Sequence, residues 1–196
     1  SLREYTSPML VEPNGVERLT DLFLKRESEA PSHVAFQVPG GTDAAGSTMW
    51  RDVTTKEFFD SARALARHFI AAGIKPGDAI SIMGPTRYEW VLSDVAALWA
   101  GAIVVPIYDT SAPSQVEAIV EDAGVMRAIA GTAQQAEALA GALGSADRVW
   151  TMEEVNGYEC LRDLAATEPK TIVNDAELES ARTSRALEDV ATIVDR

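Results

Sequence analysis

Between residues 73 and 131 the chain alternates between two hydrophobic patterns. Three short and largely apolar runs lie at 78–83, 102–107 and 125–130. The two segments that separate these runs carry apolar residues at every third or fourth position, which is the spacing of an amphipathic helix. A run without polar alternation, such as 102–107, favours a strand covered on both faces, as central parallel strands are. The stretch therefore predicts two consecutive βαβ units.

Turn and cap residues mark the ends of these elements. Thr86 and Glu89 have the spacing of a capping box, so we expect Thr86 to be the N-cap of the first helix, over 87–100. Gly101 suits the left-handed residue that closes this helix. Pro106 cannot donate to a strand ladder, so we place it at the carboxyl end of its strand.

The segments on either side of this stretch predict further helices and strands. Before it we expect a helix over 16–27, a hairpin of strands at 33–39 and 47–53, and a helix over 54–72 that a Thr54–Glu57 capping box opens. After it we expect a helix at 132–143, a strand at 148–152, a short helix at 159–166 and an apolar strand at 190–194. The predicted fold is α/β, with a largely parallel sheet of repeated βα units flanked by helices and an N-terminal β-hairpin.

The pattern divides the chain into four parts. Residues 1–15 form an extended lead-in, and residues 16–166 form the α/β subdomain. Residues 167–189 are polar, with no core face beyond Leu178 and Leu187, and suit either a linker or a weakly docked helix. Residues 190–196 hold the last apolar strand.

Composition excludes several classes of protein. Apolar residues make up 46% and charged residues 24% of the chain, as in ordinary globular proteins. The net charge of −13 argues against broad nucleic-acid binding. No apolar run approaches the ~20 residues of a membrane-spanning helix. Cys160 is the single cysteine, which favours a reducing compartment. We expect a cytoplasmic protein, and peripheral attachment to a membrane stays open.

Familiar catalytic motifs are absent from the sequence. The P-loop, the dinucleotide fingerprint G-x-G-x-x-G and the nucleophile elbow G-x-S-x-G do not occur. His33 and His68 lack an identifiable nucleophile or orienting partner, and no activating group lies near Cys160 in the sequence, so we interpret all three as structural. Parallel-sheet domains bind ligands beyond the carboxyl ends of their strands. The loops expected there, at 84–87, 108–111 and 131–132, hold hydroxyls and backbone donors but no catalytic set.

Several runs of residues resemble one known superfamily. GIKPGD at 73–78, Glu89-Trp90 and AGAIVVPIY at 100–108 are similar to the N-terminal region of adenylate-forming, or AMP-binding, enzymes. This superfamily comprises acyl-CoA synthetases, peptide-synthetase adenylation domains and luciferases. The run PIYDTSAPSQVEAIVEDAG at 106–124 most resembles bacterial long-chain fatty-acid–CoA ligases. The resemblance covers nearly the whole chain from about residue 16 onward.

The resemblance implies a two-step ligase reaction. A fatty acid and ATP give an acyl-adenylate and pyrophosphate with the help of Mg²⁺, and CoA then attacks to give acyl-CoA. In the family a strand like 190–194 leads into a Ser/Thr/Gly-rich phosphate loop, whereas Asp195-Arg196 follows it here. We therefore expect an N-terminal fragment of such an enzyme, inactive alone and binding no cofactor by itself. Whether it is an excised piece, a proteolytic product or a truncated reading frame stays open.

One set of site residues carries over from the resemblance. In relatives the loop after the AIVVPI-like strand lies near the docking place of the CoA nucleotide, and Asp109, Thr110 and Ser111 occupy the matching positions. The same residue types are also ordinary in turns and helix caps. No catalytic or metal-binding residue carries over. Two alternatives remain, a non-catalytic α/β domain that binds a ligand and an interaction module that forms a homodimer through exposed apolar surface.

Overall fold

Five parallel strands form the central sheet of the chain, whose computed structural model describes residues 18–186 and 189–194. The strands are β3 (Ala79–Met83), β4 (Ile103–Ile107), β5 (Val125–Ala130), β6 (Val149–Thr151) and β7 (Glu159–Cys160). They lie in the order β4-β3-β5-β6-β7, and each neighbouring pair is parallel. The predicted α/β fold with a largely parallel sheet is therefore confirmed.

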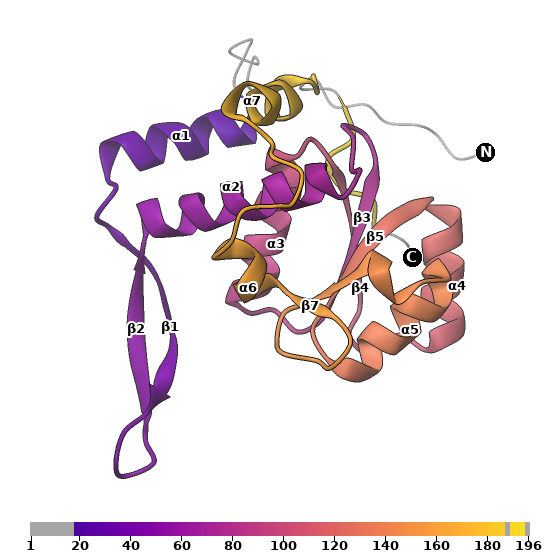
Figure 1. Cartoon of the computed structure of the whole chain (residues 1–196), viewed down its shortest axis with the longest axis horizontal. Coiled ribbons are helices and arrows are strands. Elements are labelled where there is room, and N and C mark those ends of the chain that lie inside the picture. The colour runs from indigo at the N-terminus through magenta and orange to yellow at the C-terminus, as the bar shows by residue number, and fades with distance from the viewer. Residues whose placement is uncertain (1–17, 187–188, 195–196) are drawn as a thin grey trace, which may run out of the picture.

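Helices cover both faces of this sheet (Figure 1). They are α1 (Leu19–Glu29), α2 (Thr55–Ala71), α3 (Tyr88–Trp99), α4 (Pro113–Asp122), α5 (Ala133–Leu143), the 3-10 helix η1 (Ala146–Arg148), α6 (Leu161–Ala165) and α7 (Asp175–Thr183). Helices α2, α3 and α6 share one buried cluster with Ile80 and Ile82 of β3, and α4 and α5 share a second with Ala79 and Met83. Because β3 sends side chains into both clusters, its sequence is apolar at nearly every position.

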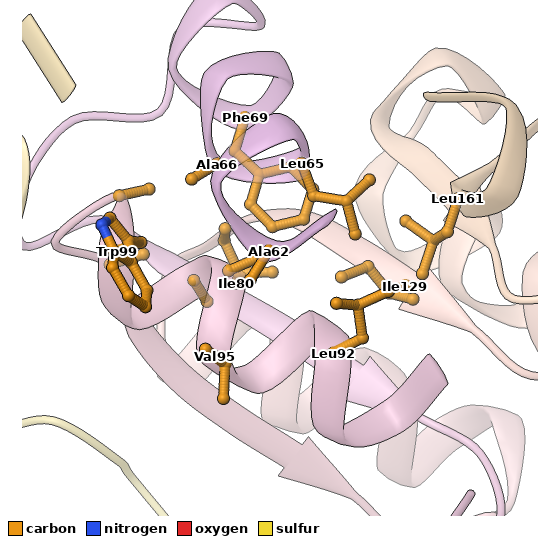
Figure 2. Packing of buried hydrophobic residues seen from close by; sticks show 14 of the residues in the cluster. Ala62, Leu65, Ala66, Phe69, Ile80, Leu92, Val95, Trp99, Ile129 and Leu161 are labelled. Atoms are coloured by element: carbon orange, nitrogen blue, oxygen red, sulfur yellow. The ribbon is translucent and has the colours of Figure 1, made fainter. Parts of the chain in front are cut away.

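The strongest packing lies where α2 crosses α3 above the sheet (Figure 2). Leu65 and Phe69 of α2 and Ile80 of β3 are 0% exposed, and Trp99 of α3 is 2% exposed. The ring of Phe69 also stacks on Trp150 of β6, with 4.7 Å between ring centroids. The apolar face that the helical spacing of α2 predicts is therefore the centre of the core.

An antiparallel hairpin precedes α2 and projects from its amino-terminal end (Figure 1). Its strands are β1 (Val34–Thr42) and β2 (Thr48–Thr54), and most of its residues are exposed. Thr54 caps α2 as predicted. Its Oγ1 accepts a hydrogen bond from the Glu57 N–H at 3.2 Å, and the Glu57 carboxylate accepts one from the Thr54 N–H at 2.8 Å.

The predicted N-cap at Thr86 is wrong. Helix α3 has Arg87 as its N-cap residue, in extended conformation and without a side-chain capping bond. The Arg87 Nε donates to the Glu89 carboxylate at 2.7 Å, and the Arg87 guanidinium also reaches Glu153 at 3.4 Å. The Glu89 carboxylate, which a Thr86–Glu89 capping box would have required, is therefore paired with Arg87 instead.

Strand β4 is covered on both faces, as its apolar run predicts, yet it forms an edge of the five-stranded sheet. On its outer side Val104 makes one parallel bridge to Thr192, with the Val104 N–H donating to the Ala191 carbonyl at 3.0 Å. Pro106, the fourth of the five strand residues, is two positions further on and turns its nitrogen to the same side. Pro106, which has no N–H to donate, thus places its nitrogen at the edge of the sheet where few backbone hydrogen bonds form.

The predicted short helix at 159–166 begins later than expected. Glu159 and Cys160 form β7 and pair with Trp150 and Thr151 of β6, so the helix α6 starts at Leu161. Two residues are too few for a periodic signal in the sequence, and the pairing with β6 decides their conformation.

The segment 167–189 contains α7, which packs on α2 and α3 with Leu178 and Ala181 buried. Arg182 is 6% exposed and donates to the Thr20 hydroxyl of α1 at 3.0 Å and to Glu179 at 2.7 Å. The lead-in at 1–15, Leu187 and residues 195–196 lie outside the described residues, and the division into four parts stays a prediction. Within the part of the chain that the structure describes, no helix is long and apolar enough to cross a membrane.

Candidate functional site

The carboxyl edge of the central sheet is where a fold of this class is expected to bind a ligand. From β3 the chain proceeds to β4 on one side and then crosses to β5 on the other side of β3. The direction of winding reverses at this point, and doubly wound sheets bind ligands beyond the carboxyl ends of the strands there. The relevant loops follow Met83, Ile107 and Ala130.

Two glycines bring the loops after β3 and β5 into direct contact. The Gly131 N–H donates to the Met83 carbonyl at 2.8 Å. A Cβ atom on Gly84 would lie 3.1 Å from the Gly131 Cα, and one on Gly131 would lie 3.0 Å from the Gly84 Cα. A side chain at either glycine would therefore crowd the opposite loop, and the two loops meet through their main chain.

Gln135 connects the loop after β5 with the loop after β4. Its Oε1 accepts a hydrogen bond from the Gly131 N–H at 3.1 Å, and its Nε2 donates to the Asp109 carbonyl at 3.2 Å. Thr132 is the N-cap of α5 and accepts from the Gln135 N–H at 3.3 Å, which fixes the first turn of the helix. Gly84 and Gly131 belong to the loops that the sequence predicts at this edge, whereas no sequence pattern points to Gln135.

A hollow of about 380 Å³ lies at the ends of β3 and β4. Its lining consists of Gly84, Pro85, Thr86, Trp90, Pro106, Ile107, Tyr108, Asp109 and Val194. Tyr108 is 75% exposed and stands at the rim. Apolar walls with few polar groups and a volume of about 300–1,000 Å³ are typical of small-molecule sites.

The residues carried over from the resemblance lie at this hollow. Asp109 belongs to its lining, whereas Thr110 and Ser111 follow outside that lining. Asp109 and Thr110 are exposed, and the Ser111 N–H closes a turn on the Tyr108 carbonyl at 3.0 Å. The N-cap of α4 is Ala112, so none of the three acts as its cap residue. The three residues lie in the turn between β4 and α4, and their role stays a prediction.

A larger hollow of about 1010 Å³ separates the hairpin from α6 and the start of α3. Most of its charged residues pair with one another, whereas Arg51 lies 3.9 Å from Glu57, which is outside the lining. Arg87 reaches Glu89 at 2.7 Å, and Arg162 reaches Glu154 at 2.6 Å. Burial opposes the charged form of Arg87, but the bonds to Glu89 raise its guanidinium pKa overall. Since the cations are already neutralised by carboxylates, this hollow is a poor candidate for a polyphosphate.

The residues interpreted as structural have structural surroundings. His68 Nε2 lies 2.8 Å from the Thr167 carbonyl, and Cys160 is buried in β7. Across residues 18–186 and 189–194, no three His, Cys, Asp or Glu side chains are grouped so as to hold a metal ion.

Comparison with known proteins identifies the family to which the chain is similar. The family model described as AMP-binding enzyme matches residues 25–194. The long-chain-fatty-acid–CoA ligase FadD15 of Mycobacterium bovis is 29% identical over 195 residues, which cover 98% of this chain and 31% of the relative. The chain therefore spans about a third of the length of the curated relative that it matches.

Solved structures share the fold at lower identity. A protein described as a long-chain-fatty-acid CoA ligase from Rhodopseudomonas palustris superposes with a TM-score of 0.63 and 21% identity, over 80% of this chain and 38% of that chain. The AMP-bound A-PCP didomain of carboxylic acid reductase from Segniliparus rugosus superposes with a TM-score of 0.60 and 20% identity, over 91% of this chain and 25% of that chain. At these identities the likeness concerns the fold.

Proposed function

The chain belongs to the family of AMP-binding enzymes, and from that premise we propose that it is the N-terminal part of a long-chain fatty-acid–CoA ligase. The observation that carries the proposal is the alignment with FadD15 of Mycobacterium bovis, which extends over 98% of this chain. The complete protein would join a fatty acid, ATP and CoA in two steps, through an acyl-adenylate. We place it in the cytoplasm.

By itself the chain is proposed to be inactive. Transfer from a triphosphate requires donors and cations that neutralise the developing charge. Among the described residues that line the crevice at the ends of β3 and β4, none is Lys or Arg, and Asp109 is the single carboxylate. One carboxylate is too few to hold Mg²⁺ without further ligands. The scaffold therefore supplies walls and backbone donors, and the machinery for the triphosphate would lie in the other two thirds of the enzyme.

The turn at Asp109, Thr110 and Ser111 is proposed to face CoA. Its support is the exposure of Asp109 and Thr110 at the carboxyl edge, beside a hollow with the aromatic side chains of Trp90 and Tyr108. Hydroxyl and backbone groups in such a turn can donate to phosphate oxygens, and aromatic faces can stack on a nucleobase.

The test is the activity of the longer polypeptide. We expect the coding sequence to continue past Arg196 into a Ser/Thr/Gly-rich loop, and the complete protein to form palmitoyl-CoA from palmitate, ATP and CoA. A stop codon directly after Arg196 in the native gene, or a complete protein that activates no fatty acid, would refute the assignment.

The second candidate is a non-catalytic module that binds a ligand or a second copy of itself. Its support is the set of large apolar side chains that lie exposed, among them Trp50 at 64% and Ile172 at 78%. Calorimetry with CoA, ATP and palmitate would detect the ligand, and sedimentation at high concentration would detect the dimer. A strictly monomeric profile together with binding weaker than millimolar would exclude this candidate.

A further inference from the structure

We propose that Gln135 is a positioning residue that holds the loop after β4 in place at the crevice. The proposal deepens the proposed function, because it assigns one side chain to the orientation of the turn that would face CoA. Its structural half concerns only the described chain and can be tested without any substrate.

The geometry gives each end of the Gln135 amide a separate partner. The Oε1 accepts from the Gly131 N–H at 3.1 Å, while the Nε2 donates to the Asp109 carbonyl at 3.2 Å. Gln135 is 8% exposed. A buried amide costs free energy unless both its donor and its acceptor are hydrogen-bonded, and here each meets the main chain of a different loop. The side chain thus fixes the distance between the two loops.

The loop after β4 has few other attachments. The Ser111 N–H bonds to the Tyr108 carbonyl inside the loop, and the Ala112 N–H bonds to Gln115 of the helix that follows. Among the hydrogen bonds of the described residues, the one from Gln135 is the side-chain bond that ties Asp109 to the neighbouring loop. Loops with few attachments open at low free-energy cost, so this bond should govern how often the turn opens.

Substitutions at Gln135 can distinguish the contribution of the acceptor Oε1 from that of the donor Nε2. Gln135→Glu keeps the acceptor for the Gly131 N–H and removes the donor to Asp109, and Gln135→Met removes both at similar volume. The adjacent Gln134 is exposed on the same helical turn, so Gln134→Met is the matched control. Glu and Met are both good helix formers, which keeps α5 intact.

The first measurement is amide hydrogen exchange on the 196-residue chain. In Gln135→Glu and Gln135→Met we expect the Ser111 amide to exchange about tenfold faster, the factor that corresponds to the loss of one hydrogen bond. The Gly131 amide should keep most of its protection in both variants, because its N–H also donates to the Met83 carbonyl at 2.8 Å. If Ser111 exchanges at the wild-type rate in Gln135→Glu, the positioning role is overturned, whatever the reaction of the complete enzyme.

The second measurement uses the complete enzyme. We expect Gln135→Glu to raise the KM for CoA about tenfold and to leave the KM for ATP within about twofold, because one turn is displaced by the loss of one bond. Equal changes in both constants, or none, would overturn the part that concerns CoA. Because exchange at Ser111 is read separately, a failure of the CoA assignment is distinguishable from a failure of the positioning role.

Discussion

The contact between Gly84 and Gly131 leads to a prediction with a built-in control. These two residues join the loops after β3 and β5 through their main chain, and we predict that Gly131→Ala destabilises the fold. The Cβ atom of an alanine there would lie 3.0 Å from the Gly84 Cα, 3.0 Å from the Pro85 Cδ and 3.0 Å from the Gln135 Oε1. The Gln135 amide can shift, but the other two atoms belong to main chain and to a proline ring.

The magnitude follows from two opposing effects. Forcing an extra methyl group into a packed site costs about 1–3 kcal/mol. Replacing glycine by alanine also restricts the unfolded chain, which stabilises the fold by about 0.4–1 kcal/mol. We therefore expect Gly131→Ala to lower the free energy of unfolding by about 1–2 kcal/mol.

The matched control is Gly141→Ala, the same substitution ten positions later. Gly141 lies inside α5, and a Cβ atom there would meet nothing within 4 Å. Alanine is favoured over glycine in a helix interior by about 0.5–1 kcal/mol, so Gly141→Ala should raise the free energy of unfolding. Urea unfolding followed by far-ultraviolet circular dichroism measures both variants. An urea midpoint for Gly131→Ala that equals or exceeds the wild-type midpoint would refute the close contact.

Three further predictions concern the core and the charged groups. Leu65→Ala should cost about 2–5 kcal/mol in urea unfolding because Leu65 is 0% exposed, whereas Leu19→Ala at a 53% exposed position should cost under about 0.5 kcal/mol. Arg182→Met should cost about 1–3 kcal/mol at pH 7, because it removes the charged hydrogen bonds to Asp21 and Glu179 and leaves Asp21 only the more distant Arg18, at 3.9 Å. The hydrogen bond from Arg182 lowers the pKa of Asp21, so the stability lost in Arg182→Met should shrink as pH falls through the folded-state pKa of Asp21. A stability difference between the two proteins that does not change with pH would contradict the pairing. Burial raises the pKa of Asp94, so Asp94→Asn should stabilise the chain at pH 7 and lose this advantage as pH falls through the raised pKa; a gain that persists in acid would argue against it.

Local signals predicted most of the architecture. The run at 102–107 is apolar because β4 is covered on both faces, and the Thr54–Glu57 capping box forms as the sequence indicates. These features depend on neighbours within a few positions, which a sequence shows directly. The prediction that Thr86 caps α3 was wrong, because the Arg87 side chain bonds to the Glu89 carboxylate instead. The Thr86–Glu89 spacing does not reveal this competition.

The features that hold the candidate site depend on contacts between distant segments. Gln134 and Gln135 are identical in type and adjacent in an Ala-rich helix, and only the second lies on the buried face of α5, where it bonds to the loops after β4 and β5. Arg182 likewise has the polarity of a surface residue, yet it lies under α1 and bonds to Thr20. Such residues are identified by their burial, and the burial of a polar side chain is known only once the fold is known.

We propose that this chain is the scaffold of an AMP-binding ligase and that the groups that handle the triphosphate lie outside it. ATP–pyrophosphate exchange in the presence of palmitate tests it most directly, with the purified 196-residue chain as the only protein. We predict exchange no faster than in a reaction without protein. Robust exchange that depends on palmitate would contradict the claim, since these residues alone would then form the adenylate.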